Sequence, residues 1–221
     1  MMRMATRFVF AFALLGLVAL PASADTLTFY LDNEFSGATP PAGTAPWVTL
    51  TFLDIVGGVR LTIENVGLVG TEFNTGVYWN FDPSKNAAVF SPTAIGTGLG
   101  TQTAWNSMSS GNDQWKPDGD GFFDFRLNLP PPGDTFTAGE TFVLEWIGLG
   151  LTTADFDFTS VNGPVGKTGF NAAAHIQGIG TSGNDSGWIE GGKIAQVPEP
   201  SSLVLVGSGL FGLAALARRK R

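Results

Sequence analysis

Short runs in which apolar and polar residues alternate recur between residues 27 and 190, and they restrict the fold more than any other feature. Between Val59 and Glu64, for example, every second side chain is apolar. Successive side chains of a strand point to opposite faces of the sheet, so each run predicts a strand with one buried and one solvated face. Antiparallel sheets commonly have one such solvated face, and the pattern therefore predicts an all-β, antiparallel β-sandwich of jelly-roll-like architecture.

Gly, Pro, Asn and Asp residues separate the runs, and no stretch between residues 25 and 195 has a helical apolar period over three turns. Residues 91–110 are low in charge and rich in Gly, Thr and Ser, which predicts a mobile loop. The Pro-Pro-Pro-Gly run at residues 130–133 predicts a surface connection. The expected strands are residues 27–31, 48–52, 59–64, 77–82, 87–90, 123–129, 142–146, 156–160, 175–179 and 188–190.

The N-terminus has the features of a secretory signal peptide. Basic residues come first, residues 8–20 form an apolar stretch, and the small residues Ala22 and Ala24 form an A-x-A cleavage site. The apolar stretch is too short for a comfortable transmembrane helix. We therefore expect the secretion machinery to export the chain, signal peptidase to remove residues 1–24, and the folded part to begin at Asp25.

The C-terminus joins three unlike features in one order. A proline–glutamate–proline triplet precedes the apolar run 203–217, and four cations end the chain. The prolines keep the triplet extended, and the cations do not cross a bilayer. Fifteen helical residues span about 22 Å, which is less than the ~30 Å of a hydrocarbon core. The triplet is Pro198, Glu199 and Pro200, and the basic stop is Arg218, Arg219, Lys220 and Arg221.

This order of features resembles the PEP-CTERM sorting signal of Gram-negative bacteria. The resemblance implies a sorting signal at residues 196–221, with a short membrane helix at about 202–217 and a basic tail at 218–221. It also implies that exosortase, a membrane protease-transpeptidase of organisms that make extracellular polysaccharide, is a partner. The domain organisation is then a signal peptide, an ectodomain at residues 25–195 and the sorting signal. The alternative is an ordinary, permanent C-terminal anchor.

The charge and the cysteine count limit the function of the exported part. Between residues 25 and 200 there are six Lys and Arg against nineteen Asp and Glu, which leaves a formal charge of −13. Such a surface repels nucleic acid and anionic lipid and suits divalent cations, neutral glycans or cationic polymers. The chain has no cysteine, so disulfides, cysteine proteases and cysteine-ligated zinc are excluded.

The densest acidic segment, residues 113–124, predicts a calcium site formed by Asp118, Asp120 and Asp124. Alternating carboxylates in a glycine-rich turn can converge on Ca²⁺, which prefers oxygen ligands. The segment does not fit an EF-hand loop, because Lys116 and Leu127 stand where acids are required. The alternative is a hairpin turn in which glycines supply positive φ and aspartates bond to their own backbone.

Other candidate site residues are weighed against a purely structural role. The chain has no G-x-S-x-G motif of a hydrolase to accompany its single histidine, His175, and one histidine without cysteine does not make a usual zinc site. We therefore expect the ring nitrogens of His175 to be satisfied by backbone or by an acid near a strand end. Trp105 and Trp115 flank a polar loop and are candidates for stacking on sugar rings. Trp79 and Trp146 lie on apolar strand faces and are expected in the core. A glycosidase needs two carboxylates in one cleft, and no pair stands out among Glu34, Glu64, Glu72, Glu140, Glu145 and Glu190.

The ectodomain also resembles a recurring class of PEP-CTERM proteins, in the segments 34–47, 118–124, 174–180 and 186–189. That resemblance implies a β-sandwich surface protein and no catalytic residue. The sequence thus predicts an exported protein, anchored transiently in the inner membrane and then delivered to the surface or extracellular matrix of a Gram-negative bacterium. Its expected role is a non-catalytic structural or adhesive component of biofilm, associated with exopolysaccharide. The alternative is a secreted carbohydrate-active hydrolase or glycan-binding module. No cofactor is expected, apart from the candidate Ca²⁺.

Overall fold

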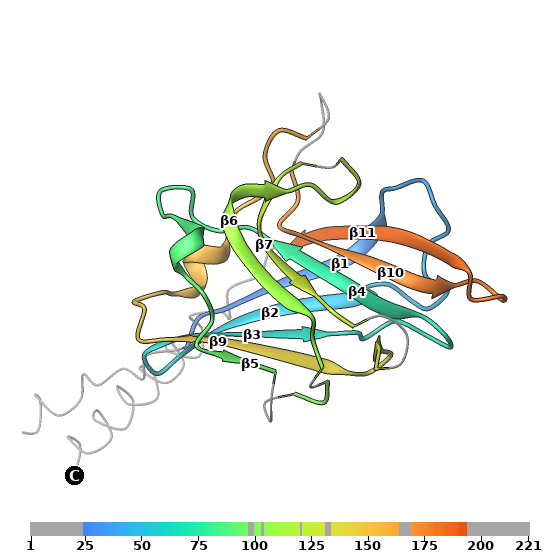
Figure 1. Cartoon of the computed structure of the whole chain (residues 1–221), viewed down its shortest axis with the longest axis horizontal. Coiled ribbons are helices and arrows are strands. Elements are labelled where there is room, and N and C mark those ends of the chain that lie inside the picture. The colour runs from blue at the N-terminus through green and yellow to red at the C-terminus, as the bar shows by residue number, and fades with distance from the viewer. Residues whose placement is uncertain are drawn as a thin grey trace, which may run out of the picture.

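The structure is a computed structural model that describes residues 24–96, 100–102, 104–119, 121–130, 134–163 and 169–193 (Figure 1). Strands dominate the described residues, and three short 3₁₀ helices accompany them. The strands are β1 (Thr26–Glu34), β2 (Val48–Ile55), β3 (Gly58–Glu64), β4 (Phe73–Trp79), β5 (Ala94–Ile95), β6 (Ser107–Trp115), β7 (Phe123–Asn128), β8 (Phe136–Thr137), β9 (Thr141–Ile147), β10 (Ala172–Ile179) and β11 (Asp185–Lys193). The 3₁₀ helices are η1 (Ala87–Val89), η2 (Pro117–Gly119) and η3 (Thr153–Phe156).

One antiparallel sheet contains all of these strands. Its order is β5-β9-β3-β2-β1-β11-β10-β4-β7-β6, and β8 pairs with β4 beside this path. The expected all-β, antiparallel class is therefore confirmed. The alternation explains the pairing of β2 with β3, in which Phe52 opposes Leu61 and Leu50 opposes Ile63, all four fully buried. Gly57, with φ of 81°, provides the positive φ that the two-residue turn between these strands requires.

The sheet curls, so that strands far apart in its order face each other across one core. Trp79 of β4 stacks on Phe125 of β7 with a centroid separation of 5.4 Å. Phe125 in turn meets Trp146 of β9 at 6.0 Å, although β9 lies near the other end of the sheet. The structure thus shows one curled antiparallel sheet, and the expected two-layer sandwich of jelly-roll-like architecture stays a prediction. The expected signal peptide and C-terminal helix lie outside the described residues, apart from Ala24.

The strands expected near residues 27–31, 48–52, 59–64, 77–82, 123–129, 142–146, 175–179 and 188–190 are present with shifted ends. The strand expected at residues 87–90 is wrong, because η1 occupies it. The side chain of Asn86 accepts a hydrogen bond from the Ala88 amide at 3.1 Å and caps this turn. The strand expected at residues 156–160 is also wrong. Phe156 ends η3, which begins after a capping box formed by Thr152 and Asp155.

The loop expected at residues 91–110 is wrong in part, since β5 pairs with β9 and β6 pairs with β7 there. β6 forms one edge of the sheet, and of its side chains the core receives only a partly buried Met108. An edge strand with little apolar content lacks the alternation that identifies strands in a sequence. At the expected surface connection, Pro130 is buried, and residues 131–133 lie outside the described part of the chain.

Candidate functional site

The acidic loop, residues 113–124, joins β6 to β7 and includes η2. Asp113 and Asp118 have φ angles of 52° and 39°, in a left-handed region that aspartate tolerates better than most residues. Gly119 and Gly121 also have positive φ. A Cβ atom on Gly121 would lie 2.9 Å from the Ser160 hydroxyl oxygen, so a larger residue would force neighbouring atoms to move. The conformation of the loop therefore depends on residues that the expected turn chemistry requires.

Asp124, at the end of this loop, links three parts of the fold. Its Oδ1 accepts a hydrogen bond from the Asp113 amide and its Oδ2 one from the Phe81 amide, both at 2.8 Å. Burial raises the pKa of the Asp124 carboxyl, the two amides oppose that rise, and the charge of Asp113 adds to it. Asp113 and Asp124 line a cleft of about 210 Å³, together with Asn80 and Asn112. This cleft is where two carboxylates of the described chain come together.

The structure describes two of the three candidate calcium ligands. Asp118 and Asp124 belong to the acidic loop as described, whereas Asp120 lies outside the described residues. Within the described ranges no group of three acidic or histidine side chains is placed to hold a metal ion. Calcium binding by this loop stays a prediction.

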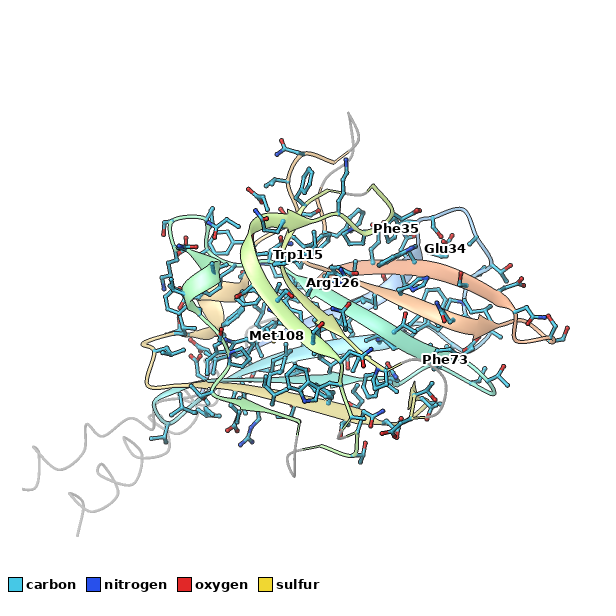
Figure 2. The ribbon with its side chains drawn as sticks, in the orientation of Figure 1. Glu34, Phe35, Phe73, Met108, Trp115 and Arg126 are labelled. Atoms are coloured by element: carbon cyan, nitrogen blue, oxygen red, sulfur yellow. The ribbon has the colours of Figure 1, made fainter. Side chains whose placement is uncertain are left out.

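The four tryptophans weighed in the sequence divide as follows. Trp79 and Trp146 are fully buried, which confirms their expected place in the core. Trp105 is 37% exposed and is not part of either buried cluster. Trp115 is partly buried against a second cluster, which we call the outer aromatic cluster. It consists of the buried Tyr78, Phe123 and Ala173, with the partly buried Phe35, Trp115 and Trp188 packed on them (Figure 2).

His175 lies beside this outer aromatic cluster and has a partner, as expected for a histidine of structural role. Its Nδ1 is 2.8 Å from the Thr75 hydroxyl, and its ring stacks on Trp188 with a centroid separation of 4.5 Å. The partner is thus a hydroxyl rather than the expected backbone group or acid. Burial lowers the pKa of His175, and the negative charge of Asp118 partly opposes this.

Five of the six glutamates weighed as catalytic candidates, all except Glu64, bond through their side chains to partners elsewhere in the described fold rather than to one another. Glu145 forms an ion pair with Arg60 at 2.6 Å, and Glu72 accepts hydrogen bonds from the amides of Ala42 and Val69. The partners of Glu34, Glu140 and Glu190 include Ser36, Thr137 and Asn33 respectively. Sequence reasoning missed the Asp113 and Asp124 pair, although the two residues stand at the start and end of the same acidic loop.

Sequence reasoning also missed Arg126 of β7. The guanidinium of Arg126 lies over the ring of Tyr78, 5.7 Å from its centroid, and so borders the outer aromatic cluster. The available signal was the alternation of Asp124, Arg126 and Asn128 with the apolar residues of the same strand. That alternation places Arg126 on the face that points away from the main core.

Comparison with known proteins assigns the C-terminal segment. The family model of the PEP-CTERM protein-sorting motif matches residues 196–221. No curated protein and no solved structure matches the chain. Among the residues that the structure describes, no helix has the length and apolar character needed to span a membrane. The motif indicates an exported protein that is held at the membrane and processed by exosortase. The chain is therefore a PEP-CTERM sorting domain-containing protein.

Proposed function

We propose that this protein is a non-catalytic structural or adhesive component of the bacterial surface or extracellular matrix, where it associates with exopolysaccharide. The observation that carries the proposal is the sorting motif at residues 196–221. The described part of the chain agrees with such a role. Nine of its carboxylates bond to main-chain amides or to basic side chains of the fold itself and so have a structural role.

The route to the surface follows from the chemistry of the two ends. In the proposal, cleavage after Ala24 releases the N-terminus, and the apolar run at about 202–217 holds the exported chain in the inner membrane as a short helix. The cations from Arg218 to Arg221 keep the tail on the cytoplasmic side. Pro198 and Pro200 keep the motif extended, the form in which a protease can bind a substrate backbone. Processing near this motif then frees the folded part, in which the two halves of the curled sheet act as the layers of a sandwich.

Fractionation of the native host tests this route. Antibodies against the folded part would follow the protein through cytoplasmic, inner-membrane, outer-membrane and matrix fractions, and intact mass spectrometry would define its termini. We expect the wild-type protein in the surface or matrix fraction without residues 218–221. In a strain without exosortase, it should accumulate in the inner membrane with those residues intact.

Variants of the tail sharpen the test. Replacement of Pro198 and Pro200 by alanine should cause the same accumulation, whereas Arg219→Lys, which keeps the positive charge, should leave sorting unchanged. Equal delivery of the wild-type protein and of a chain truncated at residue 196 would refute the sorting role. Deletion of the host's polysaccharide genes should move the protein from the matrix into the medium. An unchanged distribution would refute the association with polysaccharide.

The hydrolase alternative has one observation in its favour, because Asp113 and Asp124 line the same cleft. Against it, both oxygens of Asp124 already accept main-chain hydrogen bonds. Incubation of the purified protein with host polysaccharide, followed by measurement of new reducing ends, separates the two functions. We expect no release. Release that disappears in Asp113→Asn would establish the hydrolase instead.

A further inference from the structure

The outer aromatic cluster lies on the face of the sheet that points away from the main core. In β4, Val77 and Trp79 belong to the main core, whereas Tyr78 between them belongs to the outer cluster. The ring of Tyr78 lies 5.5 Å from Trp188 of β11 and 6.3 Å from Phe123 of β7. Members of the cluster thus come from β4, β6, β7, β10 and β11, together with Phe35 after β1. Trp115, Trp188 and Phe35 remain partly exposed, so aromatic surface faces the solvent here.

The cationic side chains that the structure describes divide into those paired with carboxylates and those that lie over aromatic rings. Three of those that the structure describes form ion pairs, Arg60 with Glu145, Lys85 with Asp155 and Lys193 with Asp157. The other two, Lys116 and Arg126, lie over the rings of Phe122 and Tyr78. In the described part of the chain no carboxylate lies within ion-pair distance of either. Of these two cations in the described part of the chain, Arg126 contacts Tyr78 of the outer aromatic cluster, and Lys116 follows its member Trp115 directly in the chain.

Arg126 is placed to accept an external partner. Across the sheet it stands opposite Tyr78 on one side and Ser109 on the other. Its Nε is buried and has no hydrogen-bond partner among the described residues. Glu34, the acid that precedes Phe35 in the chain, accepts hydrogen bonds from the amides of Ser36, Gly37 and Ala38. Besides the buried Nε, the guanidinium carries four terminal N–H donors, which can donate to an anionic ligand that lies beside the partly exposed rings.

The combination of groups selects one class of ligand. Indole and phenol rings stack on the apolar C–H faces of sugars. Guanidinium binds a carboxylate with two parallel hydrogen bonds, a geometry that an ammonium group does not reproduce. A sugar ring that carries a carboxylate presents both features on one small unit.

We propose that Trp115, Trp188 and Arg126 form a binding surface for acidic polysaccharide built from uronic acids. Sugar rings stack on the two indoles, the carboxylate of one sugar bonds to the guanidinium of Arg126, and Lys116 contributes a second positive charge. This inference deepens the proposed function and rests on it for the presence of polysaccharide where the protein is delivered.

Calorimetric titration of the full chain in mild detergent tests the proposal, with hexagalacturonate as the acidic probe and maltohexaose as the neutral one. We expect hexagalacturonate to bind at least tenfold more tightly, with an affinity that falls as salt is added. Arg126→Gln should weaken its binding at least tenfold and remove the preference over maltohexaose. Trp115→Ala should weaken the binding of both hexagalacturonate and maltohexaose, because both stack on the indole. Thermal unfolding of each variant establishes that it is folded.

Two variants serve as matched controls. Arg60→Gln removes a guanidinium that is already paired with Glu145, and Trp105→Ala removes an exposed indole outside the cluster. Both should bind hexagalacturonate as the wild-type protein does. If Arg126→Gln fails to fold, Lys116→Gln and Trp115→Phe provide an independent test of charge and stacking, with weaker binding expected for both.

Three outcomes would overturn the inference: no binding of hexagalacturonate, equal binding of the two probes, or equal losses in Arg126→Gln and Arg60→Gln. None of them affects the proposed function if the protein still reaches the matrix in the fractionation experiment. Conversely, tight binding of hexagalacturonate by a protein that stays in the inner membrane would support the binding surface and refute the delivery route.

Discussion

Trp79 of β4 and Trp146 of β9 meet edge to face with their ring centroids 6.4 Å apart, although five strands separate β4 from β9 in the hydrogen-bonded order of the sheet. The contact is possible because the sheet curls until its two halves share one core. Both side chains are fully buried. The two rings differ in their hydrogen bonding. The Trp146 Nε1 donates a hydrogen bond to the Phe90 carbonyl at 3.0 Å, whereas the Trp79 Nε1 is buried and has no partner among the residues that the structure describes.

That difference predicts unequal costs for the same substitution. Trp79→Phe removes ring atoms from the core and also removes an N–H group that was buried without a hydrogen bond. Trp146→Phe removes the same atoms but breaks a hydrogen bond as well. We expect the free energy of unfolding, measured by urea denaturation, to fall by about 1 kcal/mol more in Trp146→Phe than in Trp79→Phe. Alanine at either position should cost about 3–5 kcal/mol. A greater loss in Trp79→Phe would contradict the assignment of the unpaired group.

The junction between β1 and β11 joins the two halves of the sheet and predicts a glycine requirement. A Cβ atom on Gly191 would lie 1.8 Å from the carbonyl oxygen of Tyr30. Backbone would have to move, so Gly191→Ala should lower the melting temperature by several degrees or prevent folding. Gly76 of β4 is the matched control, because its added Cβ would meet no atom closer than 3.5 Å. Gly76→Ala should leave the melting temperature within about 2 °C of the wild-type value.

The sequence identifies most strands of the sheet because alternating apolar and polar residues indicate which face of a strand is buried. The prediction fails where this alternation is absent or ambiguous. β6 lies at the edge of the sheet and buries little, so its serines and asparagine resemble a loop. Residues 87–89 are apolar enough for a strand, yet the side chain of Asn86 caps a 3₁₀ turn instead. The closure of the sheet on itself is invisible in the sequence, because it depends on contacts such as that between Trp79 and Trp146.

The candidate sites depend on the same distinction between local pattern and long-range packing. The sorting motif is a local sequence feature, and it is identified without any structure. The outer aromatic cluster unites residues that lie up to 153 positions apart, from Phe35 to Trp188. Before the strand order is known, Arg126 is only one polar residue on the solvated face of β7. The same holds for Asp113 and Asp124, whose shared cleft depends on how the acidic loop closes.

The raised pKa of Asp124 predicts how stability depends on pH. Burial favours the protonated carboxyl in the folded state, so the pKa of the folded protein lies above that of the unfolded chain. The contribution of Asp124 is then complete below about pH 3.9 and is lost as the pH rises through the raised pKa. Relative to Asp124→Asn, which does not titrate, the wild-type protein should become less stable between pH 4 and pH 7. Urea denaturation across this range measures the difference.

Asp82 provides a control of opposite sign. Hydrogen bonds from Ser84 lower the pKa of its carboxyl, so its contribution is present above the pKa of the unfolded chain and is lost as the pH falls. Relative to Asp82→Asn, the wild-type protein should therefore become less stable as the pH decreases below 4. If the stability of the wild-type protein relative to Asp124→Asn changes with pH in the same direction as its stability relative to Asp82→Asn, the burial of Asp124 does not control its ionisation.

The only histidine of the chain allows a direct measurement beside the outer aromatic cluster. Burial lowers the pKa of His175 below 6.5, since the charged imidazolium is poorly solvated against Trp188. Stability that depends on the neutral ring is present above pH 6.5 and is lost as the pH falls through the lowered pKa. Proton NMR should therefore show a single imidazole signal that titrates below pH 6.5. Asp118→Asn should lower that pKa further, because it removes a negative charge that favours the imidazolium. The Thr75 hydroxyl lies 2.8 Å from Nδ1, and if it stabilises the neutral ring, Thr75→Val should raise the pKa of His175. A lower pKa in Thr75→Val would mean that Thr75 stabilises the charged form instead.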